Sequence, residues 1–442
     1  MTGRGVNCHM IFVTRKRGPH MNIHIKDILA LMPEGVETRS IYISDGVIAS
    51  VTEAPEGFIA EKTIHGSGKM LIPGLVNAHT HAPMTILRNC ADDRLFNDWL
   101  FGRIMPLEDK LTADDCYWGT MLAITEMLRT GTTAFIDMYY HTNYCVRAIC
   151  DAGIRAAYSR GMSGENGSGE EKLREALEDC ERWKDRDNIS FMLAPHAPYT
   201  CDEGFQREVA AEAKLKGLAI NTHLCESLAE IETIRGRYGC TPIELVDRNG
   251  LLSETTVAAH CVHLTDNDIG ILAQRGVHVV TNPVSNLKLA NGVAPVMKML
   301  SAGVKVALGT DGAASNNSLN MFREMSMLSL IHKGVNHDAL AITAREGFAI
   351  ATRNGAKAIG RSDIGEIRTG YAADLVILDL DQPNMQPPND LIAALVYSAN
   401  GSEVETVIVG GNVLMENRDF LTIDYNEVVY EVNKTSERIG TR

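Results

Sequence analysis

Eight short apolar runs between residues 71 and 312 constrain the fold of this chain more than any other feature of its sequence. The segments between the runs, such as 112–130 and 204–217, carry apolar residues at the three- and four-residue spacing of amphipathic helices. Buried strands that alternate with helices form a parallel sheet, and eight such units can close into a barrel. The sequence therefore predicts an α/β protein with a (β/α)₈ (TIM) barrel. Its strands would be LIPGLVNAHTH, TTAFIDM, IRAAYSRG, ISFMLAPHAPY, AINTHLCE, TVAAHCVH, HVVTNPVSN and KVALGTDG.

A smaller β domain is predicted from the two ends of the chain. IYIS and VIASV are joined by Asp45-Gly46, and a second pair of runs turns around Gly410-Gly411, which are hairpin signals. With ADLVILDLD at 373–381, these runs indicate a small β-sandwich beside the barrel. We expect residues 21–73 and 360–442 to form this composite domain, residues 74–359 to form the barrel, and residues 1–20 to be a disordered tail or an upstream start.

Charge and composition exclude several classes of partner. A net charge of −14 would repel phosphates, which argues against nucleic acid or an anionic membrane as the main partner. No stretch approaches the ~18 apolar residues of a membrane span. The ten cysteines contain no C-x-x-C pair, which indicates reduced thiols in the cytoplasm. We therefore expect a cytoplasmic protein with a small-molecule substrate, and a homo-oligomer is compatible with the sequence.

Polar side chains at the predicted strand ends indicate a metal site. His79 and His81 end the first strand two residues apart, so both face the barrel interior, although an isolated H-x-H also fits two histidines without a role. Strand ends of a barrel converge on one mouth, where active sites of this fold lie. Imidazoles and a carboxylate there suit Zn²⁺ or Fe²⁺ and leave a position for water, whose pKa such a metal lowers to about 7. The other strand-end candidates are His223 and Glu226, His260 and His263, and Asp311.

The ordered motifs PGLVNAHTH, HLCE, AAHCVH, NPVSNLKLANG and LGTDGAASNN resemble the amidohydrolase superfamily. Within it, the chain is similar to the aminohydrolases that deaminate S-adenosylhomocysteine and 5′-methylthioadenosine. Two-metal relatives usually carry a carboxylated lysine on the fourth strand, whereas the fourth predicted strand, 189–199, has no lysine and offers His196. The resemblance therefore implies one Zn²⁺ per subunit, or Fe²⁺ in its place, held by His79, His81, His223 and Asp311.

The resemblance also implies the catalytic roles. Glu226 would be the proton shuttle that protonates the purine ring nitrogen while hydroxide attacks C6. His260 would orient the hydroxide, and Asp311 would accept the proton of the attacking water as well as bind the metal. The alternatives are a solvated carboxylate at a helix start for Glu226 and a core histidine for His260.

Substrate contacts follow from the same resemblance. Glu108 would bind the ribose hydroxyls, His196 the purine or ribose, and Arg160 the amino-acid carboxylate of S-adenosylhomocysteine. Trp99 would stack on the nucleoside or pack in the core, and Arg160 could instead form a structural salt bridge. These residues favour an adenine nucleoside as the substrate.

The chain departs from the family pattern where a second arginine is expected. Lys172 stands at the matching position and Arg174 follows two residues later. Lysine keeps the charge but loses bidentate geometry, so 5′-methylthioadenosine, 5′-deoxyadenosine and adenosine remain candidates beside S-adenosylhomocysteine. Two other functions are left open: a related hydrolase of another ring, such as a guanine or cytosine deaminase or a triazine chlorohydrolase, and a scaffold without catalysis.

Overall fold

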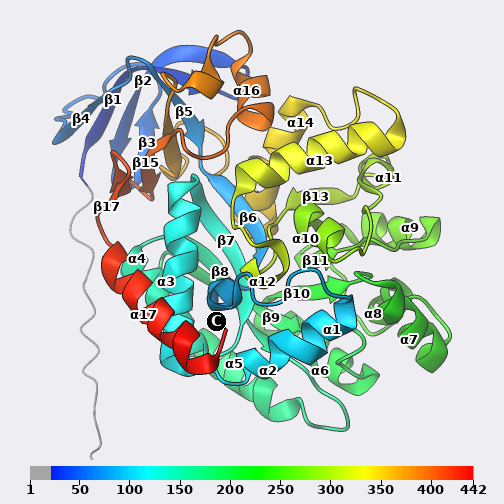
Figure 1. Ribbon diagram of the computed structural model, residues 1–442. Coiled ribbons are helices and arrows are strands. Elements are labelled where there is room, and N and C mark those ends of the chain that lie inside the picture. The colour runs from blue at the N-terminus through cyan, green and yellow to red at the C-terminus, as the bar shows by residue number, and fades with distance from the viewer. Residues whose placement is uncertain (1–20, 442) are drawn as a thin grey trace, which may run out of the picture.

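The computed structural model describes residues 21–441, and the tail predicted at 1–20 lies outside the described residues (Figure 1). Eight parallel strands form one sheet in the order β6 to β13. The backbone N–H of Asp311, just past β13, donates to the carbonyl of His79 on β6 at 3.0 Å, so the sheet curls into a nearly closed barrel. The predicted barrel is confirmed. Its strands are β6 (Leu75–Thr80), β7 (Thr132–Tyr139), β8 (Arg155–Met162), β9 (Ile189–Pro195), β10 (Ala219–Leu224), β11 (Thr256–His260), β12 (His278–Thr281) and β13 (Lys305–Leu308).

Small and branched side chains fill the barrel interior. Val76, Ala134, Val257 and Ala307 come from four different strands and belong to one fully buried cluster. The candidate ligands stand at the ends of the barrel strands, beyond this apolar cluster. The packing therefore leaves the mouth of the barrel as the place where polar groups converge.

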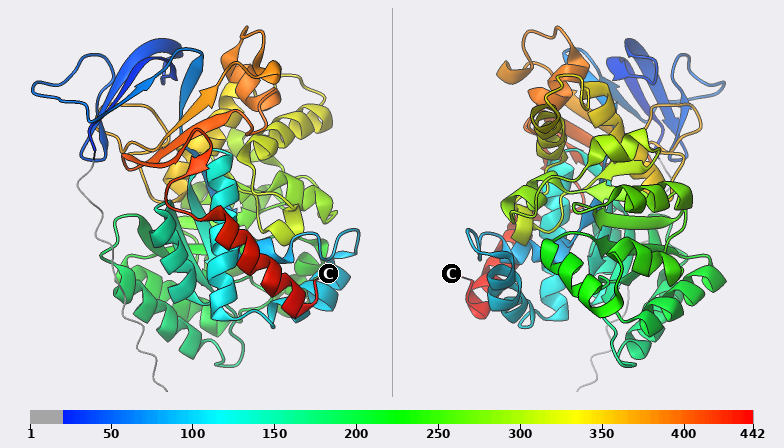
Figure 2. Two further views of the ribbon diagram at one scale, coloured as in Figure 1. Left: turned by 60° about the vertical axis from the view of Figure 1, so that its left-hand side comes forward. Right: turned by 90° about the vertical axis from the view of Figure 1, so that its right-hand side faces the viewer.

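Helices surround the barrel and begin and end at the expected signals (Figure 2). Thr112 caps α3 through a capping box, and Gly217 ends α6 with a left-handed φ of 65°. The helices that follow the strands are η1 (Ala82–Leu87), α1 (Phe96–Trp99), η2 (Leu100–Ile104), α2 (Met105–Glu108), α3 (Ala113–Arg129), α4 (Thr142–Ala152), α5 (Glu170–Trp183), α6 (Glu203–Lys216), α7 (Leu228–Tyr238), α8 (Pro242–Arg248), α9 (Asp266–Arg275), α10 (Pro283–Lys288), α11 (Val296–Ser301), α12 (Ala313–Asn316), α13 (Met321–Asn336), α14 (Ala344–Ala349), η3 (Ile350–Asn354) and α15 (Gly355–Ala358).

The two chain ends build a second sheet at one end of the barrel (Figures 1 and 2). Its order is β17-β16-β15-β14-β5-β1-β2-β3, with β4 beside β1. Both predicted hairpins are present, with positive φ at Asp45-Gly46 and at Gly410-Gly411. The domain limits at 73 and 360 stay a prediction. The elements are β1 (Ile23–Leu31), β2 (Val36–Ser44), β3 (Val47–Ser50), β4 (Lys62–His65), β5 (Lys69–Pro73), β14 (Leu375–Asp379), η4 (Pro383–Met385), α16 (Leu391–Tyr397), β15 (Val404–Val409), β16 (Asn412–Glu416), β17 (Asp419–Phe420) and α17 (Tyr425–Ile439).

The last helix, α17, packs on the barrel rather than on the terminal sheet. Thr435 donates to the carboxylate of Asp115 on α3 at 2.6 Å, and Lys110 donates to the carbonyl of Ile439 at 2.9 Å. In Figure 1 the end of α17 lies near α2, which contains Glu108. The C-terminal helix thus supports a segment at the rim of the barrel mouth.

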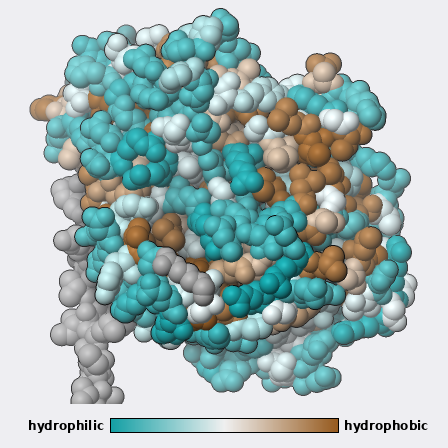
Figure 3. Space-filling model, in the orientation of Figure 1, coloured by the Kyte–Doolittle hydropathy of each residue, from teal (hydrophilic) through white to brown (hydrophobic). Residues whose placement is uncertain are grey.

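The face of the molecule shown in Figure 3 is mostly hydrophilic, with an apolar area over α13. On α13, Met321 and Met325 are buried in the core, whereas Leu330 and Val335 are half or more exposed. No helix within residues 21–441 is long and apolar enough to cross a membrane.

A buried ion pair joins the barrel to the terminal sheet. Arg155, which begins β8, donates to both carboxylate oxygens of Asp374 at 2.8 and 3.0 Å, and the N–H of Gly410 donates to Asp374 at 2.7 Å. Asp374→Ala would leave the Arg155 guanidinium buried without its partner. We expect a loss of about 3–5 kcal/mol in the free energy of unfolding, measured by denaturant titration. Asp381→Ala, at an exposed position two residues past the end of β14, should change the free energy of unfolding by less than about 0.5 kcal/mol, and equal losses would contradict a specific role for the pair.

Candidate active site

The predicted metal ligands meet at the barrel mouth. Nε2 of His81 lies 3.2 Å from Nε2 of His223. Oδ1 of Asp311 lies 3.6 Å from Nε2 of His79 and 3.4 Å from Nε2 of His81. Two overlapping groups have ligand spacing, one of His79, His81 and Asp311 and the other of His79, His223 and His260. The four predicted ligands therefore converge, with His260 beside them, whereas His263 belongs to neither group.

The hydrogen bonds of these histidines fit a bound cation. His81 Nδ1 lies 2.7 Å from the carbonyl of Met138, and His223 Nδ1 lies 2.8 Å from the carbonyl of His196. A carbonyl only accepts, so both Nδ1 atoms carry hydrogen, and both Nε2 atoms present lone pairs to each other. The ring nitrogens of His79, which is fully buried, have no hydrogen-bond partner within residues 21–441. A divalent cation among these nitrogens would satisfy all three rings.

Burial keeps these imidazoles in the form that binds metals. Burial lowers the pKa of His79 to about 4, and burial together with the neighbouring His196 places the pKa of His223 well below its usual value. For Asp311, burial acts in the raising direction, but the nearby imidazoles of His79, His260 and His81 bring the net pKa well below the usual range. Neutral histidines and an ionised aspartate are the forms required of ligands.

Two serines and one backbone N–H orient Asp311. Ser285 and Ser315 donate to its Oδ2 at 2.6 and 2.7 Å, and the N–H of Gly312 donates to Oδ1 at 2.7 Å. Oδ2 is thus fully engaged, and Oδ1 is the oxygen that faces His79 and His81. Hydrogen bonds of this kind fix a carboxylate ligand and tune its affinity for metal.

Asp137 on β7 holds the backbone on both sides of His81. Its Oδ1 accepts from the hydroxyl of Thr80 at 2.8 Å and from the N–H of Ala82 at 2.7 Å. His81 itself bonds to Met138, the next residue on β7. Three consecutive residues at the end of the first barrel strand, 80–82, are therefore tied to the second strand, which sets the direction of the His81 ring.

Glu226 and His260 lie together beside the ligand group. Oε2 of Glu226 is 3.9 Å from Nε2 of His260, and Glu230 accepts from the N–H of Glu226 at 2.9 Å. Burial raises the pKa of Glu226, which favours a carboxyl that carries a proton. Burial alone would lower the pKa of His260, but the carboxylates of Glu226 and Asp311 raise it on balance. The pair is arranged for proton transfer at the edge of the ligand group.

The other predicted contacts lie around the mouth. Glu108 has a buried Oε1 without a hydrogen-bond partner within residues 21–441, and burial raises its pKa. The His196 ring lies 4.7 Å from that of His223, centre to centre. Trp99 is 7% exposed and donates to the carbonyl of Ala314 at 3.3 Å, so packing accounts for it without a ligand.

The cations at the end of β8 already have partners. Arg160 donates to Glu175 on α5 at 2.6 Å, which is the salt bridge considered as its structural alternative. Lys172 donates to the carbonyl and the hydroxyl of Ser163 at 2.8 Å, directly past β8. Arg174 is exposed and pairs with Glu178. Of the two candidates for the second family cation, Lys172 is the one that reaches the strand end.

Sequence reasoning assigned no role to several residues that contact the site. Ser285, Asn286 and Asn291 lie within the motif NPVSNLKLANG, and Ser315 lies within LGTDGAASNN. Both motifs carry the resemblance to the amidohydrolase superfamily, and that resemblance is the signal in the sequence that points to these residues. Their partners lie up to 65 residues away, as for Asn291 and Glu226, so the contacts depend on the barrel having closed.

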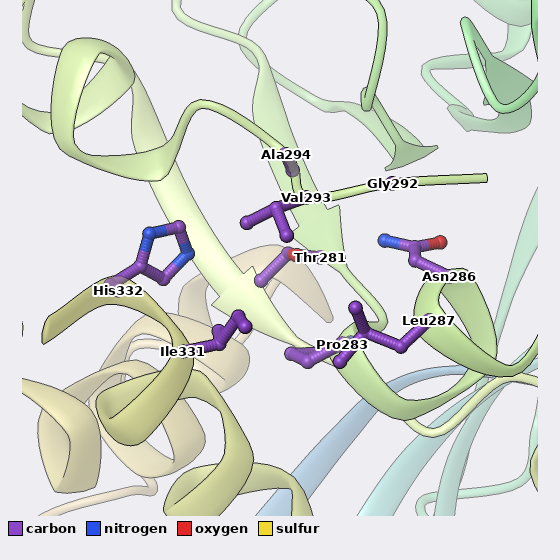
Figure 4. Close-up of a pocket in the computed structure, with 9 residues that line it drawn as sticks. All are labelled: Thr281, Pro283, Asn286, Leu287, Gly292, Val293, Ala294, Ile331 and His332. Carbon is purple, nitrogen blue, oxygen red and sulfur yellow. The ribbon is translucent and has the colours of Figure 1, made fainter. Parts of the chain in front are cut away.

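A small pocket lies between α10 and α13 (Figure 4). Asn286 and Leu287 of α10, Val293 from the following segment, and Ile331 and His332 of α13 contribute to its lining. It has room for about one water molecule, so it cannot take a nucleoside. The convergent polar groups at the mouth remain the candidate active site.

Comparison with known proteins agrees with this geometry. The sequence profile of the Amidohydrolase family matches residues 70–414. The 5-methylthioadenosine/S-adenosylhomocysteine deaminase of Dictyoglomus thermophilum is 44% identical over 417 residues, which is 94% of this chain and 98% of that protein. The enzyme of the same name from Acetivibrio thermocellus is 45% identical over 429 residues, 95% of this chain and 100% of that protein.

Solved structures share the architecture. An adenosine deaminase from Xanthomonas campestris with bound zinc superposes with a TM-score of 0.91 at 34% identity and covers 96% of this chain and 100% of its own. An atrazine chlorohydrolase from Arthrobacter aurescens complexed with zinc has a TM-score of 0.86 at 23% identity, covers 94% of this chain and 100% of its own, and shows the shared fold alone. The chain belongs to the amidohydrolase family and, within it, to the group of the 5-methylthioadenosine/S-adenosylhomocysteine deaminases.

Proposed function

We propose that this protein is a hydrolytic deaminase of adenine nucleosides. Water replaces the amino group at C6 of the purine, and the products are the inosine analogue and ammonia. The observation that carries the proposal is the buried Glu226 carboxyl, 3.9 Å from His260 and beside the convergent histidines and Asp311. The relatives named for deamination of 5-methylthioadenosine and S-adenosylhomocysteine support the same reaction.

His79, His81, His223 and Asp311 are the residues that would hold one Zn²⁺ per subunit. When bound there, the ion supplies Lewis acidity and a water of lowered pKa. The lone pairs of His81 and His223 and the unpartnered ring of His79 support this assignment. The zinc in the related adenosine deaminase favours Zn²⁺ over Fe²⁺.

The remaining steps belong to the side chains of this chain. Glu226 gives its proton to the purine ring nitrogen next to C6, which makes C6 more electrophilic, and it later recovers a proton from the oxygen that has added at C6. Asp311 accepts the first proton of the attacking water and passes it to the amino group, which leaves as ammonia. His260, whose Nε2 faces Glu226, accepts a hydrogen bond from the attacking water and so orients it. Ammonia leaves once the C–N bond breaks.

The rim residues support a nucleoside rather than a free base. The unpartnered Oε1 of Glu108 can accept from ribose hydroxyls, and His196 lies beside the ligand group, where the base or ribose would pass. The cationic groups of Arg160 and Lys172 lie near the end of β8, where they can contact a 5′ substituent. Trp99 is packed in the core and has no substrate contact in this scheme.

A spectrophotometric screen tests this function. Adenosine, 5′-deoxyadenosine, 5′-methylthioadenosine, S-adenosylhomocysteine, guanine and cytosine would be offered to the metal-loaded protein. We expect turnover of the adenine nucleosides. Turnover confined to guanine, cytosine or a chlorinated triazine would identify a hydrolase of another ring, and no turnover of any compound would point to a scaffold.

Arg160→Ala tests recognition of the amino-acid tail. Loss of a charge-assisted hydrogen bond to the carboxylate should lower kcat/KM for S-adenosylhomocysteine about 10- to 100-fold and that for adenosine less than about 3-fold. Arg174→Ala removes an exposed cation of the same region and should leave kcat/KM unchanged for both substrates. Equal losses on both substrates would show that Arg160 serves only its ion pair with Glu175.

A further inference from the structure

One short segment after β12 contacts all three groups to which the mechanism assigns proton transfer. It comprises residues 285–291, from α10 to the turn that follows it. Ser285 donates to Asp311 at 2.6 Å, Asn286 bonds to His260 at 2.8 Å, and Asn291 bonds to Glu226 at 3.0 Å. The three partners come from the ends of three other strands. The segment therefore acts on the reacting groups from one side.

Asn286 fixes which nitrogen of His260 carries hydrogen. Its amide oxygen lies 2.8 Å from His260 Nδ1, and an amide oxygen only accepts, so Nδ1 is the donor. The amide nitrogen of Asn282 lies 3.3 Å from the same atom, a longer contact that the shorter one overrides. Nε2 is then left to face Glu226 and the mouth, 3.9 Å from Oε2.

Asn291 fixes which oxygen of Glu226 carries the proton. Its amide nitrogen donates to Oε1 at 3.0 Å, and both residues are less than 10% exposed. An oxygen that receives an N–H serves best as the carbonyl-like acceptor, so the acidic hydrogen of a protonated Glu226 sits on Oε2. Oε2 is also the oxygen nearer to His260.

The segment is firmly held from behind. Glu324 on α13, fully buried, accepts from the N–H of Val284 at 3.2 Å and from the amide of Asn316 at 2.6 Å. Leu287 packs beside Ile331 of α13 in the pocket of Figure 4. A segment that is held in this way at its start can position a neighbour with little freedom.

We propose that Asn286 and Asn291 are positioning residues of the deaminase site: Asn286 selects the Nδ1–H tautomer of His260, and Asn291 places the transferable proton of Glu226 on Oε2. This assignment rests on the proposed function, because it concerns the same proton transfers. Neither asparagine needs to touch the substrate, since each acts through its partner.

The same substitution at the two positions gives a sharp test. Asn286→Asp keeps an oxygen acceptor for His260 Nδ1–H, so kcat should fall less than about 3-fold. Asn291→Asp replaces the donor by an acceptor that faces Oε1, so kcat should fall about 30-fold or more, with KM changed less than about 3-fold. Asn267→Asp is the matched control, because Asn267 makes the same amide-to-glutamate bond, to Glu244 at 3.0 Å, at an exposed position.

Three further measurements separate positioning from folding. Metal content and Tm should stay close to those of the wild type in both Asp variants. The ¹⁵N spectrum of histidine-labelled, metal-loaded wild type, with His260 identified by its absence in His260→Gln, should show hydrogen on Nδ1. Asn286→Leu, which removes the acceptor, should lose that single tautomer and lower kcat about 10-fold or more.

The outcomes distinguish the two claims. Equal losses in the two Asp variants, the reverse order of losses, or hydrogen on Nε2 of His260 in the wild type would overturn the positioning roles. The spectrum of the wild type decides the tautomer even where a variant fails to fold. Absence of deamination by the wild type would overturn the proposed function, whereas an active wild type with Asp variants that behave alike would overturn only this inference.

Discussion

Glu226→Gln should lower kcat for adenine nucleosides by about 10²–10⁴-fold and leave the metal content unchanged. The amide has nearly the shape of the carboxyl and can still accept from Asn291, so the local structure should persist. It cannot give an acidic proton to the purine. Because the pKa of the buried Glu226 is raised, the wild-type side chain can carry that proton where an exposed glutamate would have lost it.

Steady-state kinetics with parallel metal analysis checks this result. Glu232→Gln, the same change at an exposed position of the neighbouring helix α7, should keep full activity. Activity of Glu226→Gln within about 3-fold of the wild type would remove the proton-transfer role of Glu226. Loss of metal in the same variant would show instead that Glu226 supports the ligand group.

Asp311→Ala should abolish both metal binding and turnover. Asp311 is the only carboxylate in either group with ligand spacing among residues 21–441, and its Oδ1 faces His79 and His81 at 3.6 and 3.4 Å. Alanine removes a ligand and the acceptor for the proton of water together. The expected fall in kcat is at least about 10³-fold, because Lewis acidity and the nucleophile are lost at once.

Metal analysis after dialysis and the deamination assay measure the two effects. Asp266→Ala changes an exposed aspartate that pairs with Lys298, and it should alter neither the metal content nor the rate of deamination. A fully metal-loaded Asp311→Ala protein would contradict the ligand assignment. The set His79, His223 and His260 would then be the stronger candidate.

Regular local patterns explain why the fold was predictable. The eight barrel strands lie where alternating apolar runs and amphipathic spacing placed them, and α3 is capped at Thr112 as its sequence suggests. Both hairpins form where Asp45-Gly46 and Gly410-Gly411 supply positive φ. The convergence of these side chains was predictable for a related reason, because a barrel brings strand ends such as His79 and Asp311 to one mouth.

Contacts between distant side chains were not accessible in the same way. No local pattern in residues 96–108 predicts the short helices α1, η2 and α2, which contain Trp99 and Glu108. The sequence also does not indicate that α17 packs on a barrel helix rather than on the terminal sheet. Whether Arg160 pairs with Glu175 or is free to bind a ligand depends on the position of helix α5. The bond between Asn291 and Glu226 forms only after three barrel strands, β10 to β12, have assembled. These features follow from packing, which the residue pattern of one segment does not encode.

Titration of Zn²⁺ into metal-depleted protein, followed by deamination of 5′-methylthioadenosine or adenosine, tests the central claim most directly. One ion held by His79, His81, His223 and Asp311 predicts activity that rises linearly and reaches its plateau at about one equivalent per subunit. Absence of deamination at every ratio, or a plateau only at about two equivalents, would contradict a mononuclear deaminase site.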